Sequence, residues 1–247
     1  MGATSFTLEQ RDSEPACLGA MSDSASIPMP GPEPPPRGVV VVAHGGQEVS
    51  TEPVTATQIA VLRMVSFARA IRHALADGKF LVLQPQFTVR GWNGAAASPV
   101  GDLLTLLDGI RARHGAVPVT LVGHSMGGRA VLRAAGHPSV HAVAALAPWI
   151  PPGEPVAQLA GRRVLLAHGN RDRITSPRNT WAFAELVREV TPVTAVEVRA
   201  GEHTMLRRGR LWHALAAEFA RASFGLGEDD PLAAAALRDT GAGRVTV

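Results

Sequence analysis

The fold is decided by residues 117–135, which read VPVTLVGHSMGGRAVLRAA. An apolar run of strand length, 117–122, leads directly into Gly123-His124-Ser125-Met126-Gly127, and a helix-forming segment follows. The pattern G-x-S-x-G between a strand and a helix predicts a tight turn that lifts the hydroxyl group of Ser125 above the end of a sheet. A side chain at either glycine would crowd such a turn, which explains why both positions are glycine.

Segments of the same two kinds alternate on both sides of this turn. The strand-length runs are rich in valine and alanine without polar alternation, which is typical of strands buried on both faces. Longer segments between them have apolar residues at helical spacing. The alternation predicts an α/β fold, a three-layer α/β/α sandwich around a mostly parallel sheet of about six strands. The expected strands are 38–43, 80–84, 117–122, 140–146, 163–167 and 193–198, and the expected helices are 57–75, 100–113, 125–135, 178–190 and 211–224.

Length and composition fit one folded domain with a segment on each side. The chain has 247 residues, of which 46% are apolar and 18% charged. That is enough apolar surface for one core, and it excludes a wholly disordered or fibrous chain. Residues 1–36 are rich in proline, serine and acidic residues, which predicts a disordered tail. Residues 37–225 hold all the expected elements, and the glycine- and alanine-rich residues 226–247 predict a flexible C-terminal tail.

The charge is uneven between these three parts. The formal net charge is +3, yet the pI is about 10.3, because every basic residue except Lys79 is an arginine and arginine stays charged at high pH. Residues 1–36 carry a net charge of −4, residues 37–225 carry +9 and residues 226–247 carry −2. A basic domain therefore lies between two acidic segments. No basic helix or aromatic platform accompanies it, so we expect no nucleic-acid partner.

Other classes of site lack their sequence signals. The single cysteine, Cys17, excludes an intrachain disulfide and a cluster of thiolate metal ligands. Because neither a phosphate-binding glycine loop nor a zinc-binding HExxH motif is present, we expect no cofactor and no metal. No apolar run approaches the roughly 20 residues of a membrane span, and the N-terminal segment does not resemble a signal peptide. We therefore expect a cytoplasmic protein without a membrane span, whose oligomeric state the sequence does not predict.

From about Gly38 to Phe224 the chain resembles the α/β-hydrolase superfamily, most closely small serine hydrolases without a cap domain of the esterase, lipase and serine-aminopeptidase-like groups. The resemblance implies a catalytic serine, acid and histidine in that chain order. Asp172 ends the segment VLLAHGNRD after one strand, and His203 ends VRAGEH after the last strand. We therefore predict Ser125, Asp172 and His203 as the catalytic residues. The alternatives are an ordinary turn aspartate and a plain loop histidine.

A second loop is expected to help stabilise an oxyanion. The segment Ala43–Gln47 reads AHGGQ and follows the first expected strand. The resemblance implies that the backbone amide of Gly46 joins that of Met126 in an oxyanion hole. The register of the loop also allows Gly45 or Gln47 as the donor.

Three further features bear on the substrate pocket. Gln47, Trp92 and Trp149 lie on loops at the carboxyl ends of strands and are candidate pocket residues, although both tryptophans could instead pack under loops. Residues 148–161 are too few for a helical cap domain, so we expect an open cleft. Arginines near the predicted acid and base could hold the acid ionised and attract an anionic substrate, or form a solvated rim. They are Arg171, Arg173, Arg207, Arg208 and Arg210.

These residues predict a serine hydrolase that cleaves a carboxylic ester through an acyl-enzyme intermediate and takes a small acyl ester as substrate. A thioesterase, a peptidase or amidase and an acyltransferase use the same three residues, and the sequence does not separate them. A protein of another class, a non-catalytic binder of a small ligand, could use the same cleft. We would expect such a binder to have lost a catalytic residue, and none of the three is missing here.

Overall fold

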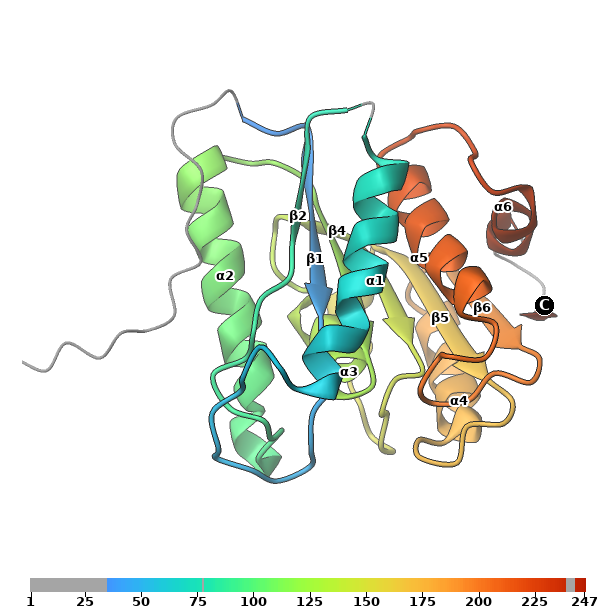
Figure 1. Ribbon diagram of the computed structural model, residues 1–247, viewed down its shortest axis with the longest axis horizontal. Coiled ribbons are helices and arrows are strands. Elements are labelled where there is room, and N and C mark those ends of the chain that lie inside the picture. Colours follow the sequence, from blue (N-terminus) through green and yellow to red (C-terminus); the bar gives the residue numbers. More distant parts are fainter. Residues whose placement is uncertain (1–34, 77, 239–242) are drawn as a thin grey trace, which may run out of the picture. The chain divides into compact units, whose positions relative to one another are not determined.

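Seven parallel strands form one sheet in the part of the chain that the computed structural model describes, residues 35–76, 78–238 and 243–247. The strand order is β2-β1-β3-β4-β5-β6-β7 (Figure 1). The α/β architecture and its parallel sheet are therefore confirmed, whereas the predicted tail 1–36 lies almost wholly outside the described residues. The strands are β1 Gly38–Ala43, β2 Phe80–Leu83, β3 Val119–His124, β4 Val140–Leu146, β5 Arg163–Gly169, β6 Val193–Val198 and β7 Arg244–Thr246.

Helices cover both faces of this sheet and complete the three layers. Residues of α1, α5 and α6 pack into the core on one face, and residues of α2, α3 and α4 pack into the core on the other. Figure 1 shows α1 and α5, which are in contact, in front of the central strands. The helices are α1 Ile59–Ala74, α2 Ser98–His114, α3 Met126–Ala134, α4 Pro177–Arg188, α5 Gly209–Ser223 and α6 Pro231–Arg238.

Strand β1 shows why the central strands are apolar throughout. Val39 and Val41 belong to the core beneath α2 and α3, whereas Val40 and Val42 belong to the core beneath α1 and α5. All four side chains are fully buried. Because successive side chains of a strand point to opposite faces, a strand covered by helices on both sides has no position left for a polar residue.

The C-terminal segment corrects the sequence analysis. A flexible tail was expected over residues 226–247, but this segment contains α6 and β7, and β7 brings the expected sheet of about six strands to seven. Strand β7 pairs with β6, and the Val247 amide donates to the carbonyl of Glu197 at 3.0 Å. Neither element has a clear sequence signal, because the buried residues of α6 are alanines, such as Ala233 and Ala236, and β7 has only three residues.

The arrangement of the sheet fixes the place of the site. Because all strands are parallel, the loops that follow β1, β3, β5 and β6 meet at the carboxyl edge of the sheet, where open α/β sheets bind their ligands. Between β4 and β5 the only helical turn is Ala157–Leu159, so the absence of a cap domain between these strands is confirmed. In the described part of the chain, no helix combines the length and the apolar character needed to cross a membrane.

Candidate active site

Ser125 occupies a strained turn between β3 and α3. Its φ of 57° and ψ of −120° lie in a region that residues other than glycine rarely adopt. A Cβ atom at Gly123 would collide with the carbonyl oxygen of Gly127, and one at Gly127 would collide with the carbonyl oxygen of His44. The two glycines of the motif therefore allow α3 to fold back closely against β3 and the end of β1, as the sequence predicted.

The three predicted side chains form one hydrogen-bonded chain. His203, in the loop after β6, places its Nε2 3.0 Å from the Oγ of Ser125 and its Nδ1 2.8 Å from the Oδ2 of Asp172, which follows β5. An ionised carboxylate can only accept, so the Nδ1–H group donates to Asp172 and Nε2 is left to accept the serine proton. Ser125 is 8% exposed, so the residue is largely buried in the turn.

Asp172 is surrounded by hydrogen-bond donors. Its Oδ2 also accepts from His168 Nε2 at 3.1 Å and from the Thr175 hydroxyl at 2.9 Å. Its Oδ1 accepts the backbone amides of Ile174 at 2.8 Å and Thr175 at 2.9 Å. Burial alone would raise the pKa of this carboxyl, but the hydrogen bonds, led by those of His168 and His203, outweigh burial and hold the pKa well below its usual range. The acid is therefore ionised and fixed in orientation without an arginine.

His168 is one of two histidines to which the sequence analysis gave no role in the site. Its ring is fully buried and lies between Asp172 and Thr180, whose hydroxyl group is 2.8 Å from His168 Nδ1. Since Nε2 donates to the carboxylate, Nδ1 accepts from Thr180. The only sequence signal is a histidine at the end of a strand, four residues before the acid, and that signal does not specify a hydrogen bond.

His124, directly before Ser125, is the second histidine to which the sequence analysis gave no role in the site. Its Nε2–H donates to the backbone carbonyl of His203 at 2.9 Å, and the two rings are 4.8 Å apart. Burial, followed by the nearby His203 ring, lowers the pKa of His124 to about 3. His124 is therefore neutral over the whole range in which the protein would be assayed, and it holds the loop that carries His203. The sequence motif leaves this position unspecified, so the contact could not be predicted.

We expect His124→Leu to lower kcat for an ester about tenfold with little change in KM, because the net contribution of one hydrogen bond is about 0.5–1.5 kcal/mol. His124→Gln, which keeps an N–H donor near the position of Nε2, should stay within about threefold of the unchanged chain. Steady-state kinetics on both variants is the measurement. Equal losses in the two variants would show that the hydrogen bond to His203 does not matter for turnover.

The same substitutions should change the response of stability to acid. The unfolded chain binds a proton at His124 near pH 6.5, whereas the folded chain does so only near pH 3. His124 therefore favours unfolding progressively as the pH falls from about 6.5 toward 3. Denaturant unfolding at pH 7 and pH 5 should show a smaller loss of stability in His124→Gln than in the unchanged chain.

The loop after β1 lies beside Ser125. The backbone of Gly46 packs so closely against the Met126 side chain that a Cβ atom would not fit. The amide of Gln47 donates to the carbonyl of Arg90 at 2.8 Å and is therefore engaged. The amides of Gly46 and Met126 have no hydrogen-bond partner among the described residues, and neither has that of Gly45. Gly46 or Gly45 thus suits the expected role better than Gln47.

The three candidate pocket residues, Gln47, Trp92 and Trp149, differ in how far they are exposed. Trp92 is 2% exposed, and the Arg129 guanidinium lies 3.8 Å from its ring centroid and 4.6 Å from that of Trp149. Arg129 is itself paired with the buried Glu154. This packing matches the alternative in which the tryptophans support loops, and Trp92 has almost no surface for a substrate. Gln47 is exposed and Trp149 is half-buried.

The described residues contain no group of three or more His, Cys, Asp or Glu side chains suited to hold a metal ion.

A family model for serine aminopeptidase, S33, matches residues 88–164. The match includes the turn at Ser125 and ends before Asp172 and His203. No curated protein sequence matches the chain.

Solved structures share the fold at low sequence identity. A lidless α/β serine hydrolase from Xanthomonas campestris is 20% identical, with a TM-score of 0.57 over 81% of this chain and 88% of that one. The esterase domain of a Rhodothermus marinus protein is 20% identical, with a TM-score of 0.53 over 84% and 89%. A monoacylglycerol lipase from Paleococcus ferrophilus is 18% identical, with a TM-score of 0.57 over 77% and 96%. The parallel sheet and these likenesses show that this chain has the fold of the α/β hydrolases.

Proposed function

We propose that the protein is a serine hydrolase that cleaves a carboxylic ester, with Ser125 as nucleophile, His203 as general base and Asp172 as the acid that orients it. The observation that carries the proposal is the hydrogen-bonded chain from Ser125 through His203 to Asp172, with distances of 3.0 and 2.8 Å. The buried, ionised carboxylate stabilises the cationic histidine that forms when the serine proton is transferred.

The reaction follows from these positions. Nε2 of His203 takes the proton of Ser125 as its oxygen attacks the acyl carbonyl, and the amides of Gly46 and Met126 bind the resulting oxyanion. The histidine then gives the proton to the leaving alcohol, which leaves an acyl group on Ser125. A water molecule, deprotonated by the same Nε2, attacks this acyl-enzyme, and the proton returns from Nε2 to the Ser125 oxygen as the carboxylic acid is released.

Ester cleavage is favoured over the other reactions of the same residues by the neighbouring structures, which include an esterase domain and a monoacylglycerol lipase. The match to a serine aminopeptidase model makes peptide hydrolysis the second candidate. That match covers the nucleophile but not the acid or the histidine, so it supports the turn and the nucleophile more than the choice of substrate.

Covalent labelling and a substrate panel test the proposal. A fluorophosphonate probe should attach to Ser125, located by peptide mass mapping, and prior heat denaturation of the protein should abolish labelling. A panel of p-nitrophenyl esters of increasing acyl length, the matching thioesters and an aminoacyl p-nitroanilide should show the highest kcat/KM on an ester. Absence of labelling would indicate a non-catalytic binder, and preference for the anilide would indicate a peptidase.

A further inference from the structure

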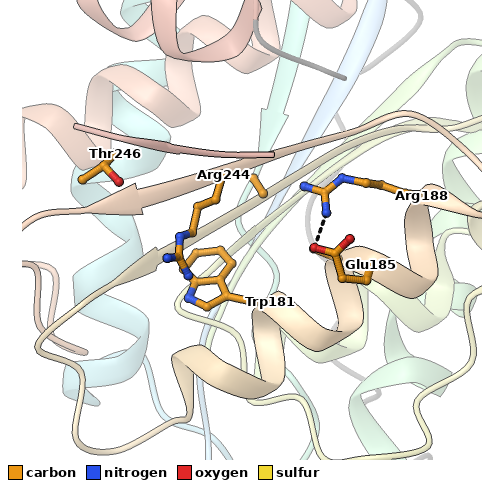
Figure 2. A pocket seen from close by; sticks show the side chains of 7 residues that line it. Trp181, Glu185, Arg188, Arg244 and Thr246 are labelled. Carbon is orange, nitrogen blue, oxygen red and sulfur yellow. Dashed lines mark hydrogen bonds and ion pairs between the residues drawn. The ribbon is translucent and has the colours of Figure 1, made fainter. Parts of the chain in front are cut away.

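Two neighbouring hollows beside the candidate active site share part of their lining. The first, about 310 Å³, lies between α4 and β7, and Figure 2 shows Arg244 beside the Trp181 ring and Glu185 joined to Arg188. The second, about 610 Å³, is lined by the loop from Asn170 to Pro177 and shares Trp181 and Arg244 with the first. We call the combined feature the α4–β7 groove. Neither Ser125 nor His203 lines it, so it is separate from the place of acyl transfer.

The arginine side chains of the groove are paired with acidic residues at one end but not at the other. Near β7, Arg188 pairs with Glu185 at 2.5 Å, and Arg244 lies 3.5 Å from Glu197 and over the ring of Trp181. At the other end, Arg173 and Arg178 are exposed, and their guanidinium groups have no hydrogen bond or ion pair within the part of the chain that the structure describes. The end of the groove beside the acid loop therefore carries two unpaired positive charges.

The start of α4 adds to this positive field. Ser176 caps the helix by accepting the Asn179 amide at 3.3 Å, and the first turn contains no acidic residue. It contains Arg178 instead, although a cation at a helix N-terminus is unfavourable because the helix dipole is positive there. The Arg178 amide also has no backbone partner among the described residues. A bound anion would satisfy the amide, the helix end and both guanidinium groups at once.

The groove is also close to the acid without opening onto its carboxylate. Residues 172–175 form part of its lining, but the Asp172 side chain is fully buried behind its hydrogen bonds. The carboxylate of Asp172 therefore points toward His168 and His203 rather than into the groove, and it forms no ion pair with Arg173 or Arg178.

We propose that the α4–β7 groove binds a small molecule that carries two or more oxyanion groups, either phosphates or carboxylates, at the end formed by Arg173, Arg178 and the start of α4. Two guanidinium forks are suited to grip such groups in pairs. The neutral part of the ligand would extend along the groove toward Trp181.

The probes are pyrophosphate, citrate and inorganic phosphate, titrated calorimetrically into the full chain at fixed ionic strength, with sodium chloride as the reference. Pyrophosphate or citrate should bind, and Arg173→Gln/Arg178→Gln should raise its Kd at least about tenfold, because charge-assisted hydrogen bonds are lost. The matched control is Arg69→Gln/Arg111→Gln, which removes the same charge from exposed positions of α1 and α2. It should change Kd less than about twofold.

Each outcome decides the proposal. Tighter binding of pyrophosphate than of citrate would assign phosphate-bearing ligands, and the reverse would assign polycarboxylates. If both double variants weakened probe binding equally, the effect would come from overall charge alone and the proposal would be wrong. It would also be wrong if no probe bound at 1 mM. Ser125→Ala should bind the probe as tightly as the unchanged chain, because Ser125 does not line the groove. A failure of the proposed esterase activity would therefore leave this result intact.

Discussion

Replacing Ser125 with alanine is expected to lower kcat for short-chain p-nitrophenyl esters by about 10⁴- to 10⁶-fold, the range seen when a serine nucleophile is removed. The substitution removes only the hydroxyl group, whose oxygen lies 3.0 Å from Nε2 of His203. KM should change little, because the backbone amides that would contact the substrate remain in place. Residual hydrolysis, measured with the purified variant at high concentration, should be insensitive to fluorophosphonate.

The matched control is Ser66→Ala on the exposed side of α1, where the hydroxyl group donates only to the carbonyl of Arg63. It should leave kcat within about twofold, as surface substitutions usually do. Thermal unfolding of both variants checks that neither has lost its fold. If Ser125→Ala kept more than about a hundredth of the activity while the control was normal, another residue would be the nucleophile.

The sequence predicted the fold well where physical constraints are strong. The bounds predicted for β1, β4 and β6 coincide with those observed, because a strand buried on both faces is a continuous apolar run between turns. The same logic failed for α6 and β7. The fully buried residues of α6 are alanines, which mark its buried face only weakly, and a three-residue strand is defined by its neighbour β6 rather than by its own sequence.

Some residues of the candidate site could likewise be predicted from the sequence, whereas others could not. Ser125 lies in a motif whose glycines are required by close backbone contacts, so the local sequence carries the information. Asp172 and His203 could be placed because they follow strands in the expected order. Thr175 and His168 meet Asp172 only through the folding of the acid loop. Contacts of this kind depend on loop geometry, which no spacing in a single sequence expresses.

The many arginines have several structural explanations. Arg129 is buried between two tryptophans and paired with Glu154, and Arg188 is paired with Glu185. Arg207 lies 3.6 Å from Glu202 on the exposed loop after His203. None of the five arginines expected near the acid and base forms a hydrogen bond or ion pair with Asp172, whose partners are histidines, a hydroxyl group and amides. The expectation that arginines ionise the acid is therefore replaced by a network of largely neutral donors.

Asp172→Asn is expected to lower kcat by about 10²- to 10⁴-fold while leaving the backbone in place. Five donors converge on the two oxygens of Asp172, three on Oδ2 and two on Oδ1. An asparagine has only one accepting oxygen, so its NH₂ group must face donors on one side. If it faces His203, the histidine must turn its unprotonated nitrogen toward the NH₂ group, and Nε2 can no longer take the proton of Ser125.

The same substitution should destabilise the fold by about 1–3 kcal/mol at pH 7, because buried donors lose their acceptor. Since the pKa of Asp172 is lowered in the folded state, its contribution is complete above the unfolded value near 3.9 and is lost as the pH falls further. The stability difference between the variant and the unchanged chain should therefore be constant from pH 7 to about pH 5 and shrink below pH 4. Denaturant unfolding at several pH values measures it.

The control for this variant is Asp229→Asn, the same chemical change at an exposed position, which should alter stability by less than about 0.5 kcal/mol and leave kcat unchanged. The combination of results is what identifies the acid. A loss of stability without a loss of kcat would mean that Asp172 only anchors its loop, through the amides of Ile174 and Thr175. A loss of kcat that persists in fully folded protein would mean that the carboxylate acts through His203, which it contacts directly at 2.8 Å and which in turn contacts Ser125.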